Sequence, residues 1–334
     1  MSAKKLPSKY PEKIYEFIVS HNNFLLSAHM NADGDAIASV VAVSLLLDSL
    51  KKDYIMVFHD QKVDIKYQYL KNSDRIMRYS EDVDFGKYLP SGKIESAIIL
   101  DVPSYKRLGD VSALLPDKSN IIKIDHHPVE DVMGEIDWID ESASSTTAMF
   151  YEVLDISKTD IDIELAKAIF TGIVYDTGRF SFSNTSSRDL YICSRMVEKG
   201  AKPDEITDRL FFQNSIAALK TIGKGLNSLE THLDGLVSVV YLSNEDLTGN
   251  NQSEIEELAN YSAAIKGSKI GLFIREAQPG FHKVSFRSKC DIDVNLVAKA
   301  LNGGGHARAA GARLHGTKDE IIDKILQEIK KQLK

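Results

Sequence analysis

The sequence predicts an α/β protein of two domains. The first has a mostly parallel sheet flanked by helices, and a helical connector joins it to a smaller C-terminal α/β domain. Three observations carry this prediction: the length of 334 residues, the alternation of short apolar runs with amphipathic stretches in the first half, and a second such alternation near the C-terminus. At about 150 residues per domain, the length favours two domains. Short runs that are apolar throughout are typical of strands covered on both faces.

The first half of the sequence predicts the parallel sheet. Strands that alternate with helices along the chain are typical of parallel sheets. The predicted strands are 24–28, 54–58, 96–100 and 121–124, and the predicted helices are 36–50, 145–154, 163–174 and 187–199. Because a further helical stretch with Pro203 follows, the first domain is predicted to span 1–188 and the connector 189–234.

The remaining residues, 235–334, predict the second α/β domain. Pro279-Gly280 is typical of a turn between two hairpin strands, and Gly303-Gly304-Gly305 is expected to break regular structure. The predicted elements are a strand at 236–242, a helix at 253–265, hairpin strands at 270–275 and 282–287, a helix at 295–301 and a closing helix at 318–333.

Composition and charge restrict the classes of partner. The chain has 43% hydrophobic and 27% charged residues, which is typical of a soluble globular protein. Its 41 basic and 48 acidic residues give a net charge of −7. Long nucleic acids are held by neutralising many phosphates, so a chain of this charge is expected to bind a small anion and no long nucleic acid.

The compartment is inferred from cysteines and hydropathy. The two cysteines, Cys193 and Cys290, show no metal-ligand spacing, and so few thiols in a long chain fit a reducing compartment. The polar N-terminus is not a signal peptide, and no apolar run approaches the roughly 18 residues that cross a membrane. We therefore expect a cytoplasmic protein without membrane contact.

Metal-ligating residue types gather where predicted strands or helices end. Carboxyl ends of parallel strands form the ligand crevice of open α/β sheets, so these groups are expected to converge. They are the segment His29-Met30-Asn31-Ala32-Asp33-Gly34-Asp35, Asp101 after the strand 96–100, Asp125-His126-His127 after the strand 121–124, and Asp176 after a helix.

Charge repulsion connects these groups to cations. Five carboxylates in one crevice would repel one another, and two divalent ions about 3.5–4 Å apart would relieve that repulsion and hold a phosphoryl group. Mixed oxygen and imidazole ligands suit manganese. Gly34 is expected to let Asp33 and Asp35 leave a tight turn in different directions. Taken singly, each Asp has an alternative interpretation as a helix N-cap, and each His as a structural hydrogen-bonding group.

The combination of these motifs resembles the DHH phosphoesterase superfamily. The HMNADGD segment, Asp101, the Asp125-His126-His127 triplet and Asp176 are similar to its four motifs. Gly303-Gly304-Gly305-His306, followed by Ala309-Ala310-Gly311, resembles the GGGH signature of the DHH-associated C-terminal domain. GGGH alone also occurs in proteins similar to alanyl-tRNA synthetase. The resemblance covers about residues 20 to 330 and is nearest to the two-domain group of nanoRNases and pAp phosphatases.

The resemblance implies two Mn²⁺ ions per chain, with Mg²⁺ or another divalent ion left open. His127 would contact the scissile phosphate, and Asp125 would orient a histidine. Ala32 stands where the family commonly has proline, which is expected to loosen a turn. The implied ligands are His29, Asp33 and Asp101 for one ion, and Asp35, Asp101, His126 and Asp176 for the other.

The resemblance also implies a set of substrate-binding residues. A glycine run can bring backbone N–H groups close to an anion, and arginine suits bidentate phosphate contacts. The alternatives without a role in binding are a flexible loop for the glycines and a solvated strand residue for Arg287. The candidates are Gly303, Gly304, Gly305, His306, Arg287, Ser288, Asn295 and Arg107.

The implied function is hydrolysis of short oligonucleotides, of linear dinucleotides such as pApA or pGpG, or of pAp, to nucleoside 5′-monophosphates by a water activated between two metal ions. An inorganic pyrophosphatase-like enzyme, a single-strand exonuclease of the same superfamily and a non-catalytic nucleotide sensor are the alternatives. The sequence leaves open the preferred substrate, the polarity of cleavage, the physiological metal and whether the chain forms a homodimer.

Overall fold

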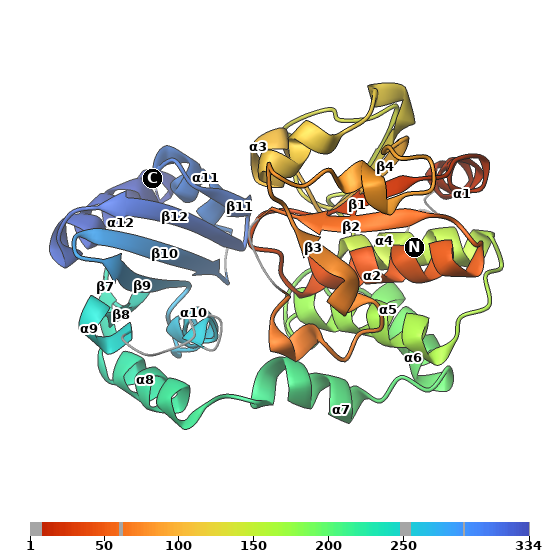
Figure 1. The fold of residues 1–334 in the computed structure, drawn as a ribbon. Helices are drawn as coiled ribbons and strands as arrows, with labels where there is room; N and C mark the ends of the chain where they lie inside the picture. The colour runs from red at the N-terminus through yellow and green to blue at the C-terminus, as the bar shows by residue number, and fades with distance from the viewer. Residues whose placement is uncertain (1–8, 60–62, 248–254, 290, 334) are drawn as a thin grey trace. The chain divides into compact units, whose positions relative to one another are not determined.

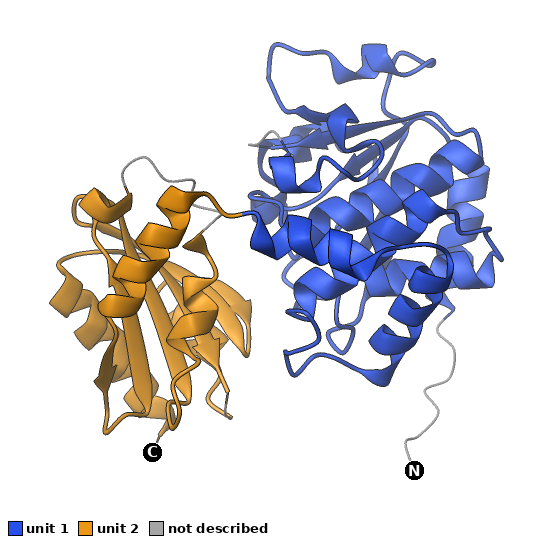
Figure 2. Cartoon of the chain, turned by 90° about the horizontal axis from the view of Figure 1, so that it is seen from below, with its two compact units in different colours: residues 1–213 blue, residues 214–334 orange. Residues whose placement is uncertain are grey.

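The computed structural model describes residues 9–59, 63–247, 255–289 and 291–333. The chain forms two compact units, 1–213 and 214–334, which are coloured separately in Figure 2. Residues 189–213 of the expected connector belong to the first unit and 214–234 to the second. The domain boundaries at 188 and 234 stay predictions.

The first unit contains a parallel sheet, as predicted. Its strand order is β3-β2-β1-β4-β5-β6, and every neighbouring pair runs parallel. The strands are β1 (Phe24–Ser27), β2 (Tyr54–Phe58), β3 (Ile76–Arg78), β4 (Ser96–Leu100), β5 (Ile121–Asp125) and β6 (Ile136–Ile139). The predicted strands thus agree with β1, β2, β4 and β5 to within a residue or so, and sequence analysis missed the short β3 and β6.

Helices cover both faces of this sheet. They are α1 (Tyr10–Ser20), α2 (Gly34–Ser49), α3 (Tyr105–Leu108), α4 (Thr146–Ile156), α5 (Ile163–Asp176), α6 (Ser187–Glu198) and α7 (Pro203–Thr207). Short helical turns lie at Ile65–Tyr67, Ser73–Arg75, Phe85–Tyr88, Gly109–Leu114 and Lys118–Asn120, and a π-helical turn, η6, at Asp208–Phe212. Figure 1 shows α2, α4, α5 and α6 on one side of the sheet and α3 on the other.

The strands of the first sheet bury apolar side chains on both faces. In β1, Phe24 and Leu26 pack with α2, α4 and α5, whereas Leu25 packs in the cluster on the opposite face. Burying one such side chain contributes roughly 1.5–3 kcal/mol. The helix α2 is buried on nearly all sides, which explains why its sequence is apolar throughout.

The second unit is built on a mixed sheet with the order β11-β12-β10-β9-β8-β7. Its pairs are antiparallel except for β8 and β9. The strands are β7 (Glu230–His232), β8 (Val237–Leu242), β9 (Ile270–Gln278), β10 (Phe281–Ser288), β11 (Gly304–His306) and β12 (Ala309–His315). The helices are α8 (Ile216–Asn227), α9 (Asn244–Leu247), α10 (Leu258–Ser262), α11 (Val294–Ala300) and α12 (Lys318–Gln332).

Two expectations for the second unit need correction. The helix expected at 253–265 is shorter, with α10 confined to Leu258–Ser262, and residues 253 and 254 lie outside the described residues. The glycine run does not simply break the structure, because Gly304 and Gly305 pair with Gly311 and Ala310 of β12. Small partners on β12 leave room for this close pairing.

Hydropathy and cysteines were the basis for the expected compartment. Within the described residues, no helix is both long and apolar enough to cross a membrane. Cys193 is a buried free thiol whose pKa is raised to about 12, mainly by burial, so it is inert at neutral pH. Cys290 lies outside the described residues.

Candidate metal centre

The cluster forms where the first sheet changes direction. β1 and β4 are hydrogen-bonded neighbours, and the strands β2 and β3 lie beyond β1 while β5 and β6 lie beyond β4. Such a switch point opens a crevice at the carboxyl ends of the strands. His29 follows β1, Asp101 directly follows β4, and Asp125 is the last residue of β5. Topology therefore brings groups that are distant in sequence to one crevice.

Asp101 lies at the centre of this cluster. Its side chain is fully buried, and its two oxygens lie 3.4 Å from the Nε2 atoms of His29 and His126 and 3.4 Å from Nδ1 of His127. Burial alone would raise its pKa, but the charge of His127 and hydrogen bonds from the three histidines hold the pKa of Asp101 well below its usual range. Asp101 also has a left-handed backbone, with φ +60°, which costs a non-glycine residue roughly 1–2 kcal/mol.

His29 and His126 present the same nitrogen to the cluster. Nδ1 of His29 lies 2.8 Å from the carbonyl oxygen of Met30, and Nδ1 of His126 lies 3.4 Å from that of Ala143. With Nδ1–H donated to a carbonyl, Nε2 is the nitrogen that faces Asp101, and it can bind a cation once it has lost its proton. A backbone carbonyl often orients a metal-binding histidine in this way.

His127 is oriented differently and contacts Asp125. Its Nδ1 lies 2.8 Å from Oδ1 of Asp125, which also accepts the backbone N–H of His127 at 3.1 Å. Burial lowers its pKa, but Asp101 and Asp125 outweigh that effect and raise the pKa of His127 to about 10. With Nδ1 occupied by a carboxylate, Nε2 is the nitrogen left for another group.

Asp35 is held by the first turn of α4, which sequence analysis missed. Its oxygens accept the backbone N–H groups of Thr146 at 2.7 Å and Thr147 at 3.1 Å, and the hydroxyl of Thr147. The hydroxyl of Thr146 donates to Asp101 at 3.0 Å, so one turn positions two carboxylates. Burial, and then the charges of Asp176 and Asp101, raise the pKa of Asp35 well above its usual value. The Ser-Ser-Thr-Thr run before an apolar helix was the available signal.

Asp33 and Asp176 complete the cluster from two helix ends. Asp33 caps α2 through Oδ1, so its interpretation as an N-cap is correct, and the same oxygen lies 3.9 Å from Nε2 of His29. Asp176 ends α5, and its Oδ2 lies 3.1 Å from Nε2 of His126. Burial raises the pKa of Asp176 to about 6, against the lowering effect of His126.

Two glycines allow this close packing, and one has a role other than the one expected. Gly34 is the first residue of α2, and a Cβ there would lie 2.3 Å from the Tyr175 ring. Its lack of a side chain therefore admits Tyr175, whereas a tight turn was expected. A Cβ on Gly172 of α5 would lie 2.1 Å from Oγ1 of Thr147 and 2.6 Å from Oδ1 of Asp35.

A fully buried lysine connects two loops of the site. Lys123 of β5 donates to the carbonyl of Pro103 at 3.1 Å and to that of Asp131 at 3.0 Å. Its Nζ lies 3.8 Å from Oδ2 of Asp125. Lys123 therefore connects the loops that follow Asp101 and His127. It also places its ammonium group beside the carboxylate of Asp125. Sequence analysis placed this position within the strand 121–124 and assigned it no role.

The donor set fits divalent cations. Asp101 shares a group of ligand atoms that lie within 4.8 Å of one another with each of three pairs: His29 with Asp33, Asp35 with His126, and Asp125 with His127. Buried carboxylates without matching positive charge are unstable in a low dielectric. Oxygen and imidazole donors around a shared carboxylate are the ligands that such cations use.

The remaining substrate candidates lie in two places. Arg107 is at the metal centre, with its guanidinium 3.4 Å from Nδ1 of His29. Arg287 and His306 each pair with Ala309, so their side chains share one face of the second sheet. Arg287 also donates from Nε to Asn260 at 3.0 Å. Gly303, Gly304 and Gly305 lead into His306 through β11.

The last two candidates, Ser288 and Asn295, are buried in the second unit. Ser288 is buried and donates to the carbonyl of Ile292 at 2.8 Å. Asn295 of α11 is 7% exposed, and its Oδ1 has no hydrogen-bond partner within the described part of the chain. The side-chain carbonyl of Asn295 is therefore a buried acceptor, and the Ser288 hydroxyl serves the local turn.

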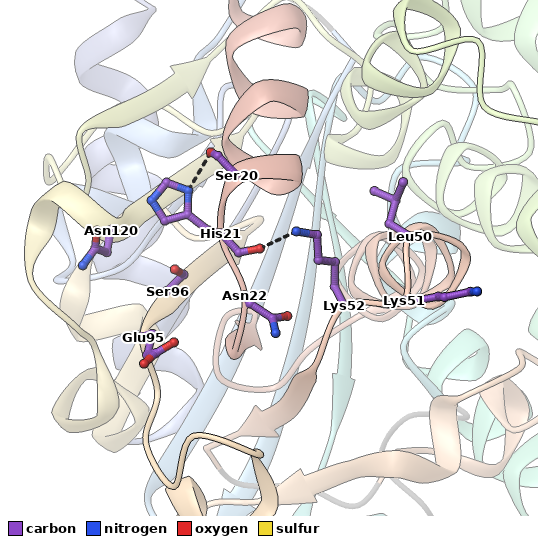
Figure 3. A pocket seen from close by; sticks show the side chains of 9 residues that line it. All are labelled: Ser20, His21, Asn22, Leu50, Lys51, Lys52, Glu95, Ser96 and Asn120. Carbon is purple, nitrogen blue, oxygen red and sulfur yellow. Dashed lines mark hydrogen bonds between the residues drawn. The ribbon is translucent and has the colours of Figure 1, made fainter.

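A pocket at the opposite edge of the first sheet does not share this chemistry. Figure 3 shows its lining side chains, which come from residues that precede β1, β2, β4 and β5 or begin β4. Its volume is about 490 Å³. Lys52 donates to the carbonyls of Val19 and His21, and Asn22 exchanges hydrogen bonds with Asp53. Because these polar groups serve the fold, the pocket offers no comparable cluster.

Comparisons with known proteins agree with the two-unit fold. The N-terminal domain of the DHH family matches residues 23–173, and the DHHA1 domain matches residues 235–334. A Thermus thermophilus protein named bifunctional oligoribonuclease and PAP phosphatase NrnA is 28% identical, over 92% of this chain and 89% of its own. A Bacillus subtilis protein of the same name is 31% identical, over 70% and 73%. An exopolyphosphatase-related protein from Bacteroides fragilis shares the fold, with a TM-score of 0.89 at 24% identity over 99% and 98% of the two chains.

Replacing Gly172 by Ala is expected to weaken divalent-cation binding by about 10- to 100-fold. The new methyl group would collide with Thr147 and displace Asp35. Titration calorimetry with Mn²⁺ measures the effect. Gly223→Ala in α8 is the matched control, because nothing lies within 4 Å of its Cβ position. Equal affinities of wild type and Gly172→Ala would contradict the role assigned to this close packing.

Cation affinity is expected to rise as the pH increases above about 6, because ligands must lose their protons before they bind a metal. Burial opposes protonation of His29 and His126, but neighbouring carboxylates raise the pKa of both, and the pKa of Asp176 is about 6. All three therefore become protonated as the pH falls, and the protons compete with the cation. Calorimetry in buffers of different ionisation enthalpy should detect proton release, which His59→Ala, outside the cluster, should leave intact. A pH-independent affinity would refute this coupling.

Proposed function

The chain belongs to the DHH family of phosphoester hydrolases, and we propose that it hydrolyses short oligonucleotides and pAp to nucleoside 5′-monophosphates. The Asp101-centred cluster is the observation that carries this proposal. It combines buried carboxylates with imidazoles at the switch point of the sheet, where α/β proteins bind ligands. The relatives named as oligoribonuclease and PAP phosphatase support the substrate class.

We propose that the cluster holds two divalent ions, preferably Mn²⁺. His29, Asp33 and Asp101 would bind one, and the second would take Asp35, Asp101, His126 and Asp176. Mixed nitrogen and oxygen donors favour Mn²⁺ over Mg²⁺, which prefers oxygen ligands and retains its waters. When bound, the ions would neutralise phosphate charge and acidify the attacking water.

His127 has the geometry of a proton donor. Asp125 accepts a hydrogen bond from Nδ1 and thereby fixes the plane of the ring. The carboxylates around the ring raise the pKa of His127 to about 10, which favours the protonated imidazole, and Nε2 is the nitrogen that Asp125 leaves to present a proton. We propose that His127 gives this proton to the departing oxygen of the phosphodiester as the bond to phosphorus breaks.

The second unit is proposed to bind the ends of a small substrate. Arg287 and His306 share a sheet face with Ala309 between them, and a small residue in that position leaves space beside two cationic or polar side chains. Arginine can hold a phosphate with two hydrogen bonds. A net charge of −7 agrees with a small ligand and no long nucleic acid.

The proposal is tested with a substrate panel. Purified protein with Mn²⁺ is expected to release nucleoside monophosphates from pAp and linear dinucleotides, and more slowly from a 5-mer. Chelation is expected to abolish turnover, since the ions supply the charge neutralisation. Pyrophosphate and a long single strand serve as comparison substrates. Cleavage of a long strand as fast as a dinucleotide, or full activity after chelation, would overturn the proposal.

Two substitutions are expected to separate metal binding from proton transfer. Asp101→Asn should abolish turnover and cation binding, because both proposed ion sites include Asp101. His127→Ala should keep most of the metal but lower kcat by about 10²–10⁴. Atomic absorption on the purified variants measures metal content, and Asp160→Asn, in the surface ion pair with Lys199, is the control. Equal metal loss in both variants would contradict the separate roles.

A further inference from the structure

A row of aromatic side chains extends from the metal centre. Tyr175 precedes Asp176, and its ring lies against Gly34, between Asp33 and Asp35 in the chain. The ring stacks on Phe211, with centroids 6.2 Å apart and planes inclined by 18°. Phe212 follows Phe211 in η6 and is 63% exposed. The row therefore begins beside the carboxylate cluster and ends in solvent.

Cationic side chains accompany this row. The guanidinium carbon of Arg179 lies 4.7 Å from the ring centre of Phe211 and 5.6 Å from that of Phe212. Nζ of Lys66 lies 5.8 Å from the ring centre of Tyr175. Rings next to cations form a surface that suits an anionic, flat ligand, because stacking and charge attraction act together.

The backbone that places Arg179 is strained. Gly178, Arg179 and Phe180 have φ values of +53°, +60° and +63°, two of them on residues that rarely adopt this conformation. Hydrogen bonds hold the turn, including Arg179 N–H to the carbonyl of Val174 at 2.9 Å and Asn184 Nδ2 to the carbonyl of Asp176 at 3.0 Å. Strain that its surroundings maintain is a feature of functional sites.

We propose that Tyr175, Phe211, Phe212 and Arg179, here called the aromatic row, bind a nucleobase of a short oligonucleotide. This inference rests on the proposed function, and it assigns the binding of one substrate base to residues that flank or follow Asp176. The base would stack on the exposed ring of Phe212, and Arg179 would attract the adjoining phosphate. Stacking tolerates any base, because each has a π-face.

A nucleobase fits this surface better than a protein partner does. One exposed ring offers an area far below the roughly 800 Å² that each partner buries in a stable protein interface. The row is also continuous, through Tyr175, with the residues that flank Asp35 and Asp176. A substrate phosphate at the cluster would therefore carry its neighbouring nucleoside towards Phe212. The row would distinguish substrates that have a second base from pAp, which has one.

The test compares kcat/KM on a linear dinucleotide, on pAp, and on two abasic forms of the dinucleotide, each of which lacks one of the two bases. Phe212→Ala is expected to lower kcat/KM on the dinucleotide by about 5- to 100-fold, the usual loss for one stacked base, and on pAp by much less. Phe212→Trp should restore most of the loss. Tyr88→Ala is the control, because Tyr88 is an exposed ring with Lys87 5.2 Å from its centre, in the segment between β3 and β4.

For one of the two abasic dinucleotides, the kcat/KM of the wild type should fall below its value on the intact dinucleotide. The kcat/KM of Phe212→Ala should be nearly the same on both, because this variant has already lost the stacking contact. Equal losses on pAp and the dinucleotide, or none on either, would overturn the proposal. If the wild type turns over no member of the panel, the proposed function fails. Calorimetric binding of a phosphorothioate dinucleotide to the wild type and Phe212→Ala then decides about the aromatic row alone, since equal affinities would refute it.

Discussion

The first unit is arranged around a buried negative charge. Asp101 has a left-handed backbone at the end of β4, and the side chains of three histidines lie 3.4 Å from its oxygens. Asp35 and Asp176 add further carboxylates in the same low-dielectric crevice, where each raises the cost of ionising the other. Such a cluster is stable only with protons or cations to neutralise it. The raised pKa values of the histidines and the fit to divalent ions are therefore two consequences of one constraint.

Helix ends lessen the same repulsion. The first turn of α4 points two backbone N–H groups at Asp35, and the first turn of α2 does so at Asp33. A helix N-terminus carries a partial positive charge, so both carboxylates are stabilised before any ion binds. This approach requires close contact between α2, α4 and α5, which Gly172 permits. Packing in the helical layer thus determines ligand geometry at the edge of the sheet.

The sequence predicted the parallel sheet, four of its strands and the groups that converge on the crevice, because strand ends and ligand types are local signals. It could not identify Thr146, Thr147 or Lys123, since each acts through a partner more than five residues away that only the fold brings near. The role of Gly34 was mistaken for the same reason, because the Tyr175 ring that excludes a side chain there lies on α5. The glycine run was expected to break the structure, and its pairing with β12 depends on small partners that sequence spacing does not reveal.

The two adjacent histidines illustrate how one strand end can divide chemical roles. β5 ends at Asp125, and the rings of His126 and His127 that follow it lie 4.8 Å apart but have different partners. His127 contacts Asp125 through Nδ1, while His126 contacts Asp101 and Asp176 through Nε2. Both rings present Nδ1 to an oxygen, but the charged carboxylate of Asp125 favours the doubly protonated ring, whereas the neutral carbonyl of Ala143 holds His126 with Nε2 towards the carboxylates, where it can bind a cation once its proton is lost. One ring is therefore suited to donate a proton and its neighbour to bind a cation. The difference follows from which partner each Nδ1 meets at the end of β5.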